Sequence, residues 1–189
     1  MKKLLFAFLF LFVGVWAWSV QGQEKIIAID NFKSKYVAPR KIEIFLPREY
    51  EKGRSRKFPV LYMHDGQNVF NASSAYGGVA WEADETARKM FKNVDVLPFI
   101  IVAIWNTEAR FHEYFPEKAL KLMTPEDREA MEAARIARGA VESPFLGDNY
   151  LKFIVKELKP FIDKRYKVLT DAPNTFIAGS SYGGLISLY

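Results

Sequence analysis

The sequence predicts an α/β fold in which a mostly parallel sheet carries helices on both faces. Strand-like and helix-like patterns alternate along the chain, which is typical of this class. One strand, Phe58–Met63, is a continuous apolar run followed by the turn signal Asp65-Gly66, as expected of a buried parallel strand. Another, Thr175–Ala178, leads directly into a glycine-rich turn. Together these patterns predict the element order β-β-β-α-β-(α)-α-β.

The composition fits one globular domain. The chain has 189 residues, of which 50% are hydrophobic and 15% aromatic, enough for one packed core and too few for two domains. The formal net charge of +5 is modest and no stripe of Lys and Arg is interleaved with aromatics, so nucleic acid is not an expected partner. With no cysteine, the domain must hold together through its core rather than through disulfides.

Residues 1–22 have the pattern of a signal peptide. Lys2-Lys3 supply the positive n-region, Leu4–Trp18 the apolar h-region, and Val20-Gln21-Gly22 the small residues before a cleavage site. We expect residues 23–189 to be released into the periplasm or the medium of a bacterium, with no membrane contact after cleavage. The alternative is an uncleaved N-terminal membrane anchor, because the apolar stretch approaches the ~20 residues that span a bilayer.

Three more strands and a first helix are expected in the first part of the chain. Short β-rich stretches lie at Ile26–Asp30 and Lys41–Leu46, and an apolar run lies at Phe99–Ile104. Residues Trp81–Phe91 have helical spacing, with charged side chains on one face. The side chains expected to face the core from this helix are Trp81, Ala87, Met90 and Phe91.

A second helix is predicted from signals at both of its ends. Thr124 is the expected N-cap, Pro125 the first helical residue, and Asp127 stands at the capping-box position. Gly139 closes the helix. Because the body of this helix is polar, we expect it to cover the mouth of the substrate pocket rather than to build the core.

The helix after Asp148 carries a wide apolar stripe. Its members recur at helical spacing, opposite a row of charged residues, and they are Leu151, Ile154, Val155, Leu158 and Ile162. Pro160 removes one backbone hydrogen bond and is expected to kink this helix near its end.

The residues with the clearest chemical meaning follow the strand Thr175–Ala178. Gly179-Ser180-Ser181-Tyr182-Gly183 has the form G-x-S-x-G, the nucleophile elbow of α/β-hydrolases. The chain must turn sharply from strand to helix here, which leaves Ser181 strained and exposed above the sheet. Glycines on either side avoid collisions in so tight a turn. The sequence therefore predicts an α/β-hydrolase fold with Ser181 as its nucleophile.

A second motif supplies the expected oxyanion hole. In this fold one backbone N–H comes from the residue after the nucleophile and another from the loop after the third strand. That loop is His64-Asp65-Gly66-Gln67-Asn68, so the expected donors are the N–H groups of Gln67 and Tyr182. Candidates to line the substrate pocket are His64, Asp65, Arg110 and His112.

Four stretches of the chain together resemble the putative esterase family. They are Tyr62–Asn68, Glu113–Pro116, Asp148–Leu151 and Gly179–Gly184. That family groups esterase D, enterochelin esterases, feruloyl and acetyl-xylan esterases and mycolyltransferases, and the resemblance runs from about Lys41 to the last residue. It implies an α/β-hydrolase fold, Ser181 as the nucleophile, and backbone oxyanion donors at Gln67 and Tyr182. Tyr182 stands where members often carry methionine, a change that should be tolerated because only its N–H is used.

The rest of a catalytic triad does not follow the elbow. An acid and then a histidine come after the serine in this fold, yet the eight residues after Ser181 include neither. We interpret His64 as a brace for the oxyanion turn rather than as the base, and His112 as either a substrate contact or a loop histidine paired with Glu113. We therefore expect a partial domain truncated just after the elbow, with the strand Thr175–Ala178 left as an unpaired apolar edge.

The sequence predicts a serine esterase that hydrolyses a carboxylic ester through an acyl-enzyme on Ser181. The expected substrate is an extracellular or periplasmic ester carried by a small molecule, a siderophore or a polysaccharide, and no metal ion or cofactor is needed. Two alternatives stay open: an acyltransferase that uses the same serine, and a non-catalytic binding domain on the same fold. The partial domain alone is expected to be inactive.

Overall fold

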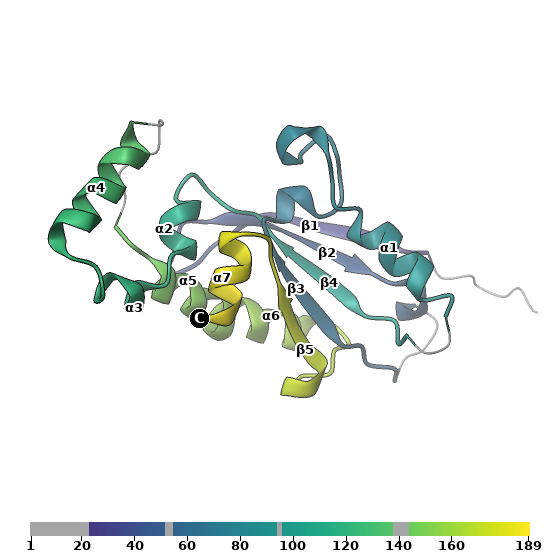
Figure 1. Cartoon of the computed structure of the whole chain (residues 1–189). Coiled ribbons are helices and arrows are strands. Elements are labelled where there is room, and N and C mark those ends of the chain that lie inside the picture. The colour runs from purple at the N-terminus through teal and green to yellow at the C-terminus, as the bar shows by residue number, and fades with distance from the viewer. Residues whose placement is uncertain (1–22, 52–54, 94–95, 138–143) are drawn as a thin grey trace, which may run out of the picture.

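The computed structural model describes residues 23–51, 55–93, 96–137 and 144–189. These residues form one sheet with helices on both faces (Figure 1). The expected signal peptide lies outside the described residues. No helix within the described ranges is long and apolar enough to cross a bilayer.

The sheet has the strand order β1-β2-β4-β3-β5. Its strands are β1 (Lys25–Phe32), β2 (Arg40–Leu46), β3 (Val60–His64), β4 (Ile100–Ile104) and β5 (Thr175–Ala178). Every strand expected from the sequence is present, and the ends differ from the expected ones by at most two residues. Short apolar runs were therefore sufficient to locate the strands.

The sheet is mixed in its strand directions. β1 pairs with β2 and β2 with β4 in antiparallel fashion, whereas β4 and β3, and β3 and β5, run parallel. All five residues of β4 are buried, as expected for a parallel strand covered on both faces. The α/β class is thus confirmed, although the described sheet has as many antiparallel as parallel pairs. The difference arises because β2 runs opposite to the other four strands and pairs with both β1 and β4, which makes both of its pairs antiparallel.

One face of the sheet is covered by α1 (Ala83–Met90). The apolar cluster on this face consists of Phe45, Val69, Ala87, Ile101 and Ala103. Phe91 packs against this cluster as expected, but Trp81 and Met90 are 37% and 42% exposed, contrary to the prediction. The left-handed Glu82 precedes the helix, so Trp81 falls outside it and the apolar face is shorter than the sequence pattern indicates.

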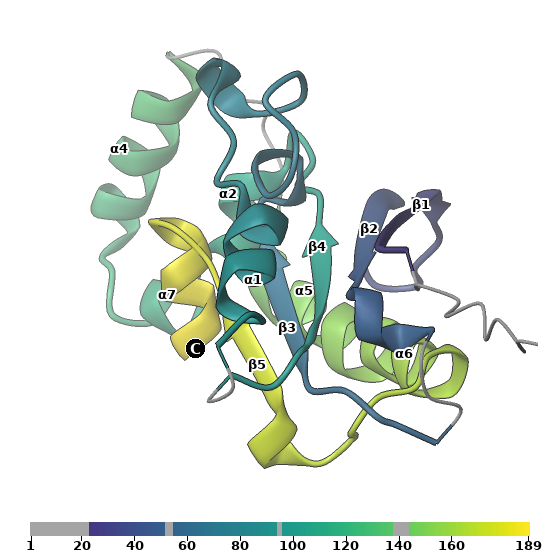
Figure 2. The ribbon, with the colours of Figure 1, turned by 90° about the vertical axis from the view of Figure 1, so that its right-hand side faces the viewer.

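The other face carries α5 (Gly147–Phe153), α6 (Lys159–Arg165) and α7 (Tyr182–Leu188). α1 and the α5–α6 pair lie on opposite sides of the sheet (Figures 1 and 2). Buried side chains of this layer pack with the strands into the larger core. They include Tyr150, Phe153, Ile154, Leu158, Ile162 and Ile186.

Pro160 disturbs the long helix as expected, and the disturbance takes the form of a π-helical turn. Between α5 and α6 the chain passes through the turn Ile154–Leu158, where the Lys159 N–H donates to the Ile154 carbonyl five residues back. The wider turn relieves the clash between a proline ring and the preceding helical turn. It also moves Val155 off the apolar stripe, so that this side chain is 56% exposed, contrary to the prediction.

The polar middle of the chain forms three helices beyond the carboxyl end of the sheet. They are α2 (Arg110–Tyr114), α3 (Glu117–Leu120) and α4 (Pro125–Ile136). The Thr124 hydroxyl caps α4 by accepting the Asp127 N–H at 3.1 Å, as predicted. Gly139, the expected end of this helix, lies outside the described residues. The 3₁₀ turns are η1 (Arg48–Tyr50), η2 (Gly66–Asn68), η3 (Tyr76–Gly78) and η5 (Ala172–Asn174).

A buried ion pair connects β2 to α2. The Arg40 guanidinium donates to both carboxylate oxygens of Glu113, from Nη1 to Oε2 at 2.9 Å and from Nη2 to Oε1 at 2.6 Å. Both side chains are almost fully buried, and the guanidinium also lies over the rings of Tyr150 and Phe153. Because a lone buried charge is costly, each partner depends on the other.

We predict that Arg40→Met lowers the free energy of unfolding by about 3–5 kcal/mol, because it leaves the Glu113 carboxylate buried without its partner. The double variant Arg40→Met/Glu113→Leu removes both charges and is expected to recover most of that loss. Urea unfolding of the full-length protein, followed by circular dichroism, measures both. A double variant no more stable than Arg40→Met would contradict the prediction.

β5 forms one edge of the described sheet. Its backbone pairs with β3, and its Phe176 and Ile177 side chains are 52% and 39% exposed. Both side chains border a hollow of about 620 Å³ beside the strand. The other residues around this hollow are Pro59, Leu61, Val96, Leu97, Phe99 and Asn174. The expected apolar edge is therefore present in the described part of the chain.

An apolar edge of this kind can pair with the same edge of another molecule. We predict that residues 23–189, expressed alone, self-associate or precipitate. Phe176→Lys is expected to reduce the association, because a charged side chain on an edge strand blocks pairing. Size-exclusion chromatography with light scattering tests both proteins. A stable, monodisperse monomer of the unaltered residues 23–189 would show that the edge is protected.

Candidate active site

Ser181 occupies the sharp turn between β5 and α7. Its backbone has φ 55° and ψ −121°, in the left-handed half of the conformational map, which residues other than glycine rarely adopt. The turn is also crowded, since a Cβ on Gly179 would lie 2.5 Å from the carbonyl carbon of Gly183. Glycine is therefore required at 179, and the strained, exposed serine expected from the G-x-S-x-G pattern is present.

Ser181 lies in a pocket of about 470 Å³ at the carboxyl end of the parallel strands. This is the end of an α/β sheet at which ligands bind. The lining residues are Asp65, Gln67, Asn68, Tyr76, Asn106, Thr107, Arg110 and Ser181. The pocket thus brings Ser181 together with three residues expected at the site, Gln67, Asp65 and Arg110. Each of these lining residues carries an amide, hydroxyl, carboxylate or guanidinium group.

The two expected oxyanion donors lie where backbone N–H groups are unpaired. Gln67 belongs to the 3₁₀ turn η2, and Tyr182 is the first residue of α7. Within the described residues neither N–H has a hydrogen-bond acceptor, which is usual in the first turn of a helix. The Tyr182 ring packs against Phe111, with ring centroids 5.0 Å apart. Their assignment to an oxyanion hole stays a prediction.

Asp65 is the centre of a polar network beside Gln67. Its backbone is left-handed, with φ 55°, and its carboxylate is almost fully buried. Arg110 donates from Nε to Oδ1 and from Nη2 to Oδ2, at 2.6 and 2.7 Å. Asn106 donates from Nδ2 to Oδ1 at 2.6 Å. The hydrogen bonds to Asp65 raise the pKa of Arg110 above its usual value, so the guanidinium stays charged.

His64 lies under the elbow rather than in the pocket. Its side chain is fully buried, its Nδ1 is 2.8 Å from the Tyr150 hydroxyl, and its ring packs against Tyr114. A Cβ on Gly183 would lie 3.2 Å from His64 Cβ, so the first turn of α7 rests directly on this histidine. His64 is placed to brace the turn. Its predicted place in the substrate pocket is wrong, because α7 covers the end of β3.

His112 contacts α4 instead of the pocket. Its side chain is fully buried, and Nε2 lies 3.2 Å from Glu132 Oε1 and 3.0 Å from Arg135 Nη1. The prediction of a substrate contact or a pair with Glu113 is therefore wrong. Glu113 is paired with Arg40 instead, because consecutive residues of a helix do not face each other.

These contacts fasten α4 to the flank of α2. The Arg135 guanidinium also lies 3.7 Å from the centroid of the Phe111 ring. No described residue of α4 lines the Ser181 pocket. The helix lies beside α2 (Figure 1), so the structure does not support the expected cap over the pocket mouth.

Two tyrosines that support the site were not identified from the sequence. The Tyr114 hydroxyl accepts the Asp65 N–H at 3.2 Å, and the rings of Tyr114 and Tyr150 lie 5.0 Å apart next to the end of β3. Burial raises the pKa of both tyrosines, so their hydroxyls keep their protons. Each tyrosine lies in one of the stretches that resemble the esterase family, Glu113–Pro116 and Asp148–Leu151. That resemblance could have marked both as candidate site residues. Only the fold shows that the two meet.

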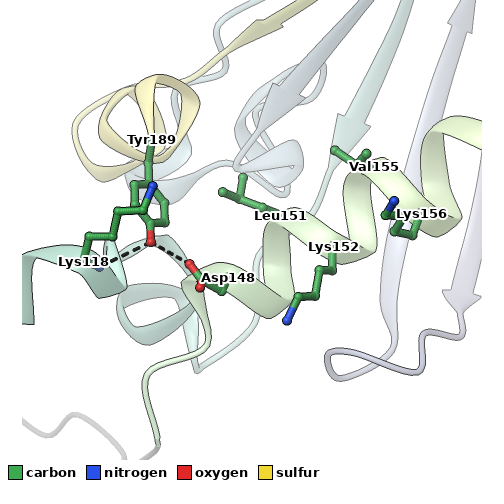
Figure 3. A pocket seen from close by; sticks show the side chains of 7 residues that line it. All are labelled: Lys118, Asp148, Leu151, Lys152, Val155, Lys156 and Tyr189. Carbon is green, nitrogen blue, oxygen red and sulfur yellow. Dashed lines mark hydrogen bonds between the residues drawn. The ribbon is translucent and has the colours of Figure 1, made fainter.

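A second hollow, of about 310 Å³, lies between α3, α5 and the end of α7 (Figure 3). The Tyr189 hydroxyl donates to Asp148 Oδ1 at 2.6 Å and accepts the Lys118 N–H at 3.3 Å. The remaining lining residues are Leu151, Lys152, Val155 and Lys156. This hollow shares no residue with the Ser181 pocket and is not part of the candidate active site.

Burial lowers the pKa of His64 from its usual value of 6.5 to about 4, so the folded state binds a proton there less readily than the unfolded state. The stabilising contribution of neutral His64 is complete above pH 6.5 and is lost as the pH falls to about 4. We predict that wild-type protein loses roughly 3 kcal/mol more stability than His64→Gln between pH 7 and pH 4. Urea unfolding across this range is the measurement, and parallel pH profiles for the two proteins would contradict it.

The mixed sheet and the strand-to-helix turn at Ser181 place the protein among the α/β-hydrolases. Within that class, the family described as Putative esterase matches residues 35–189, most of the chain. The chain belongs to this family. The esterase resemblance that the four sequence stretches indicated is therefore confirmed.

Similar proteins are known both as sequences and as structures. The uncharacterized protein YbbA of Bacillus subtilis (strain 168) is 23% identical over 150 residues, which cover 79% of this chain and 50% of that protein. A ferulic acid esterase structure has a TM-score of 0.58 at 24% identity, covering 89% of this chain and 52% of that one. An IroE-like serine hydrolase from Shewanella oneidensis also has a TM-score of 0.58, at 20% identity, covering 86% and 44%. At these identities the structures show the fold, and the chain spans about half the length of the proteins it matches.

Proposed function

We propose that the protein is a serine esterase that hydrolyses carboxylic esters. The observation that carries the proposal is Ser181, held at φ 55° between β5 and α7 and open to the pocket that Gln67 also lines. A left-handed serine is retained only where the surrounding structure enforces it, and such strain is concentrated at active sites. The family membership supports the same reaction class.

In the proposed reaction, Ser181 Oγ attacks the ester carbonyl carbon while a general base takes the hydroxyl proton. The carbonyl oxygen becomes an oxyanion held by the N–H groups of Gln67 and Tyr182, each contributing roughly 3 kcal/mol. The carbon–oxygen bond to the alcohol then breaks, the alcohol takes the proton from the base, and an acyl-enzyme remains. Water repeats the same steps on the acyl-enzyme and releases the acid.

The base in this proposal is neither of the two histidines in the chain. His64 and His112 are fully buried and line no part of the Ser181 pocket. Burial also lowers the pKa of His64 to about 4, which makes it a weak base. We propose that the acid and the base of the triad come from outside these 189 residues, in keeping with a match that spans about half of each related protein.

The pocket supports a polar ester as the substrate. Its walls carry amide, hydroxyl and charged groups, which discriminate in favour of substrates that can hydrogen-bond to them. Tyr76, 91% exposed at the edge of the pocket, offers a flat aromatic surface. We propose an acyl group carried on a hydroxyl-rich molecule, such as a polysaccharide or a siderophore, outside the cytoplasm. The expected signal peptide supports this compartment.

Labelling with a fluorophosphonate probe tests the nucleophile in the full-length protein. We predict that wild-type protein is labelled and that Ser181→Ala abolishes the label, because the probe reacts with an activated serine. Ser180→Ala is the matched control, since Ser180 is an exposed serine in the same turn and should be dispensable. Residues 23–189 alone are expected to label poorly. Labelling that survives Ser181→Ala would exclude Ser181 as the nucleophile.

A further inference from the structure

The turn that carries Gln67 is fastened by side chains from the segment after β4. The Asn106 N–H donates to Gln67 Oε1 at 3.3 Å, while Asn106 Nδ2 donates to Asp65 Oδ1 at 2.6 Å. Arg110 holds both carboxylate oxygens of Asp65, at 2.6 and 2.7 Å. The Arg110 guanidinium also lies 5.0 Å from the centroid of the Tyr114 ring, whose hydroxyl accepts the Asp65 N–H. All of these contacts converge on one turn.

The backbone of Asp65 explains why this turn needs support. Its φ of 55° is a conformation that aspartate tolerates better than most residues but still adopts at a cost. Asp65 lies between the end of β3 and the 3₁₀ turn η2, so its backbone conformation influences the direction of the Gln67 N–H two residues later. With both oxygens of the Asp65 carboxylate engaged, the turn is held in one arrangement.

We propose that Arg110 and Asn106 are positioning residues that clamp Asp65, so that the Gln67 N–H stays aimed at the carbonyl oxygen of a bound ester. The inference rests on the proposed function, because it takes Gln67 as an oxyanion donor. It also assigns Arg110 an indirect role, although this side chain is 31% exposed and lines the pocket. The Asp65 carboxylate already neutralises the guanidinium, which weakens its attraction for a charged group on the substrate.

The test is the hydrolysis of p-nitrophenyl acetate, a small uncharged ester, by full-length protein. Arg110→Gln and Asp65→Asn are each expected to lower kcat about tenfold or more and to change KM less than about twofold. The reason is that a misaimed donor weakens the transition state more than it weakens substrate binding. The double variant is expected to be no slower than the slower single variant, because both changes release the same clamp.

A direct contact between Arg110 and the substrate predicts a different pattern. Arg110→Gln would then raise KM at an unchanged kcat, and its effect would add to that of Asp65→Asn in the double variant. Either result overturns the proposal. Should Arg110→Gln fail to fold by circular dichroism, Asn106→Ala replaces it. This variant removes the Nδ2 bond to Asp65 and is expected to lower kcat about threefold or more, again with KM unchanged.

Arg88→Gln is the matched control. Arg88 is 35% exposed, donates to the nearly buried Asp84 at 2.7 Å and also donates to Glu24, so it is a half-buried arginine paired with carboxylates, as Arg110 is. It belongs to α1 and lines no part of the Ser181 pocket. We expect Arg88→Gln to leave kcat and KM unchanged. A loss of kcat equal to that in Arg110→Gln would show a general effect of losing an arginine ion pair and would overturn the proposal.

Hydrogen–deuterium exchange measures the clamp without catalysis. The Asn68 N–H donates to the Asp65 carbonyl at 2.9 Å within the clamped turn. Its exchange is expected to accelerate about tenfold or more in Arg110→Gln and to stay unchanged in Arg88→Gln, because only the first releases the turn. If the full-length wild-type protein is an active esterase and exchange is unchanged in Arg110→Gln, this inference is wrong and the proposed function is unaffected. Full-length wild-type protein without esterase activity overturns the proposed function, and this inference with it.

Discussion

The buried ion pair between Arg40 and Glu113 sets the position of α2, and through α2 the position of much of the candidate site. Arg40 belongs to the sheet, whereas Glu113 belongs to a helix of five residues. So short a helix cannot hold its orientation through its own backbone hydrogen bonds. The paired guanidinium and carboxylate fit together in one planar geometry, and their removal from water makes other arrangements costly.

Consecutive residues of α2 point in different directions, so one short helix meets several parts of the molecule at once. Arg110 reaches Asp65 in the turn after β3, and Phe111 packs against the Tyr182 ring beside the elbow. His112 contacts α4 on the opposite side. The positions of the turn after β3, the elbow and α4 therefore all depend on the attachment of α2 to Arg40 in β2. A rotation of α2 would displace all three together. The Arg40–Glu113 pair therefore affects the candidate site although neither residue lines the Ser181 pocket.

The sequence could predict those features that depend on neighbours along the chain. The elbow at Ser181 follows from the spacing of nearby glycines, and the strands follow from short apolar runs. Long-range partners could not be predicted. Glu113 pairs with Arg40, 73 residues away, whereas one of the two interpretations of His112 paired it with Glu113. At the site, Asp65 and Arg110 were each recognised as pocket residues, but not as a pair. A single sequence carries no signal for which charges meet once the chain has folded.

The left-handed backbone at Ser181 also affects which substitutions this position can accept during evolution. Replacing the serine by glycine would relieve a conformational cost of about 1–3 kcal/mol, since glycine adopts positive φ freely. The same replacement would delete the hydroxyl on which the proposed chemistry depends. At this position, the substitution that makes the fold more stable would therefore remove the proposed activity. Selection for activity therefore opposes selection for stability at this position, and descendants that carry glycine here should melt at higher temperatures than their active ancestors.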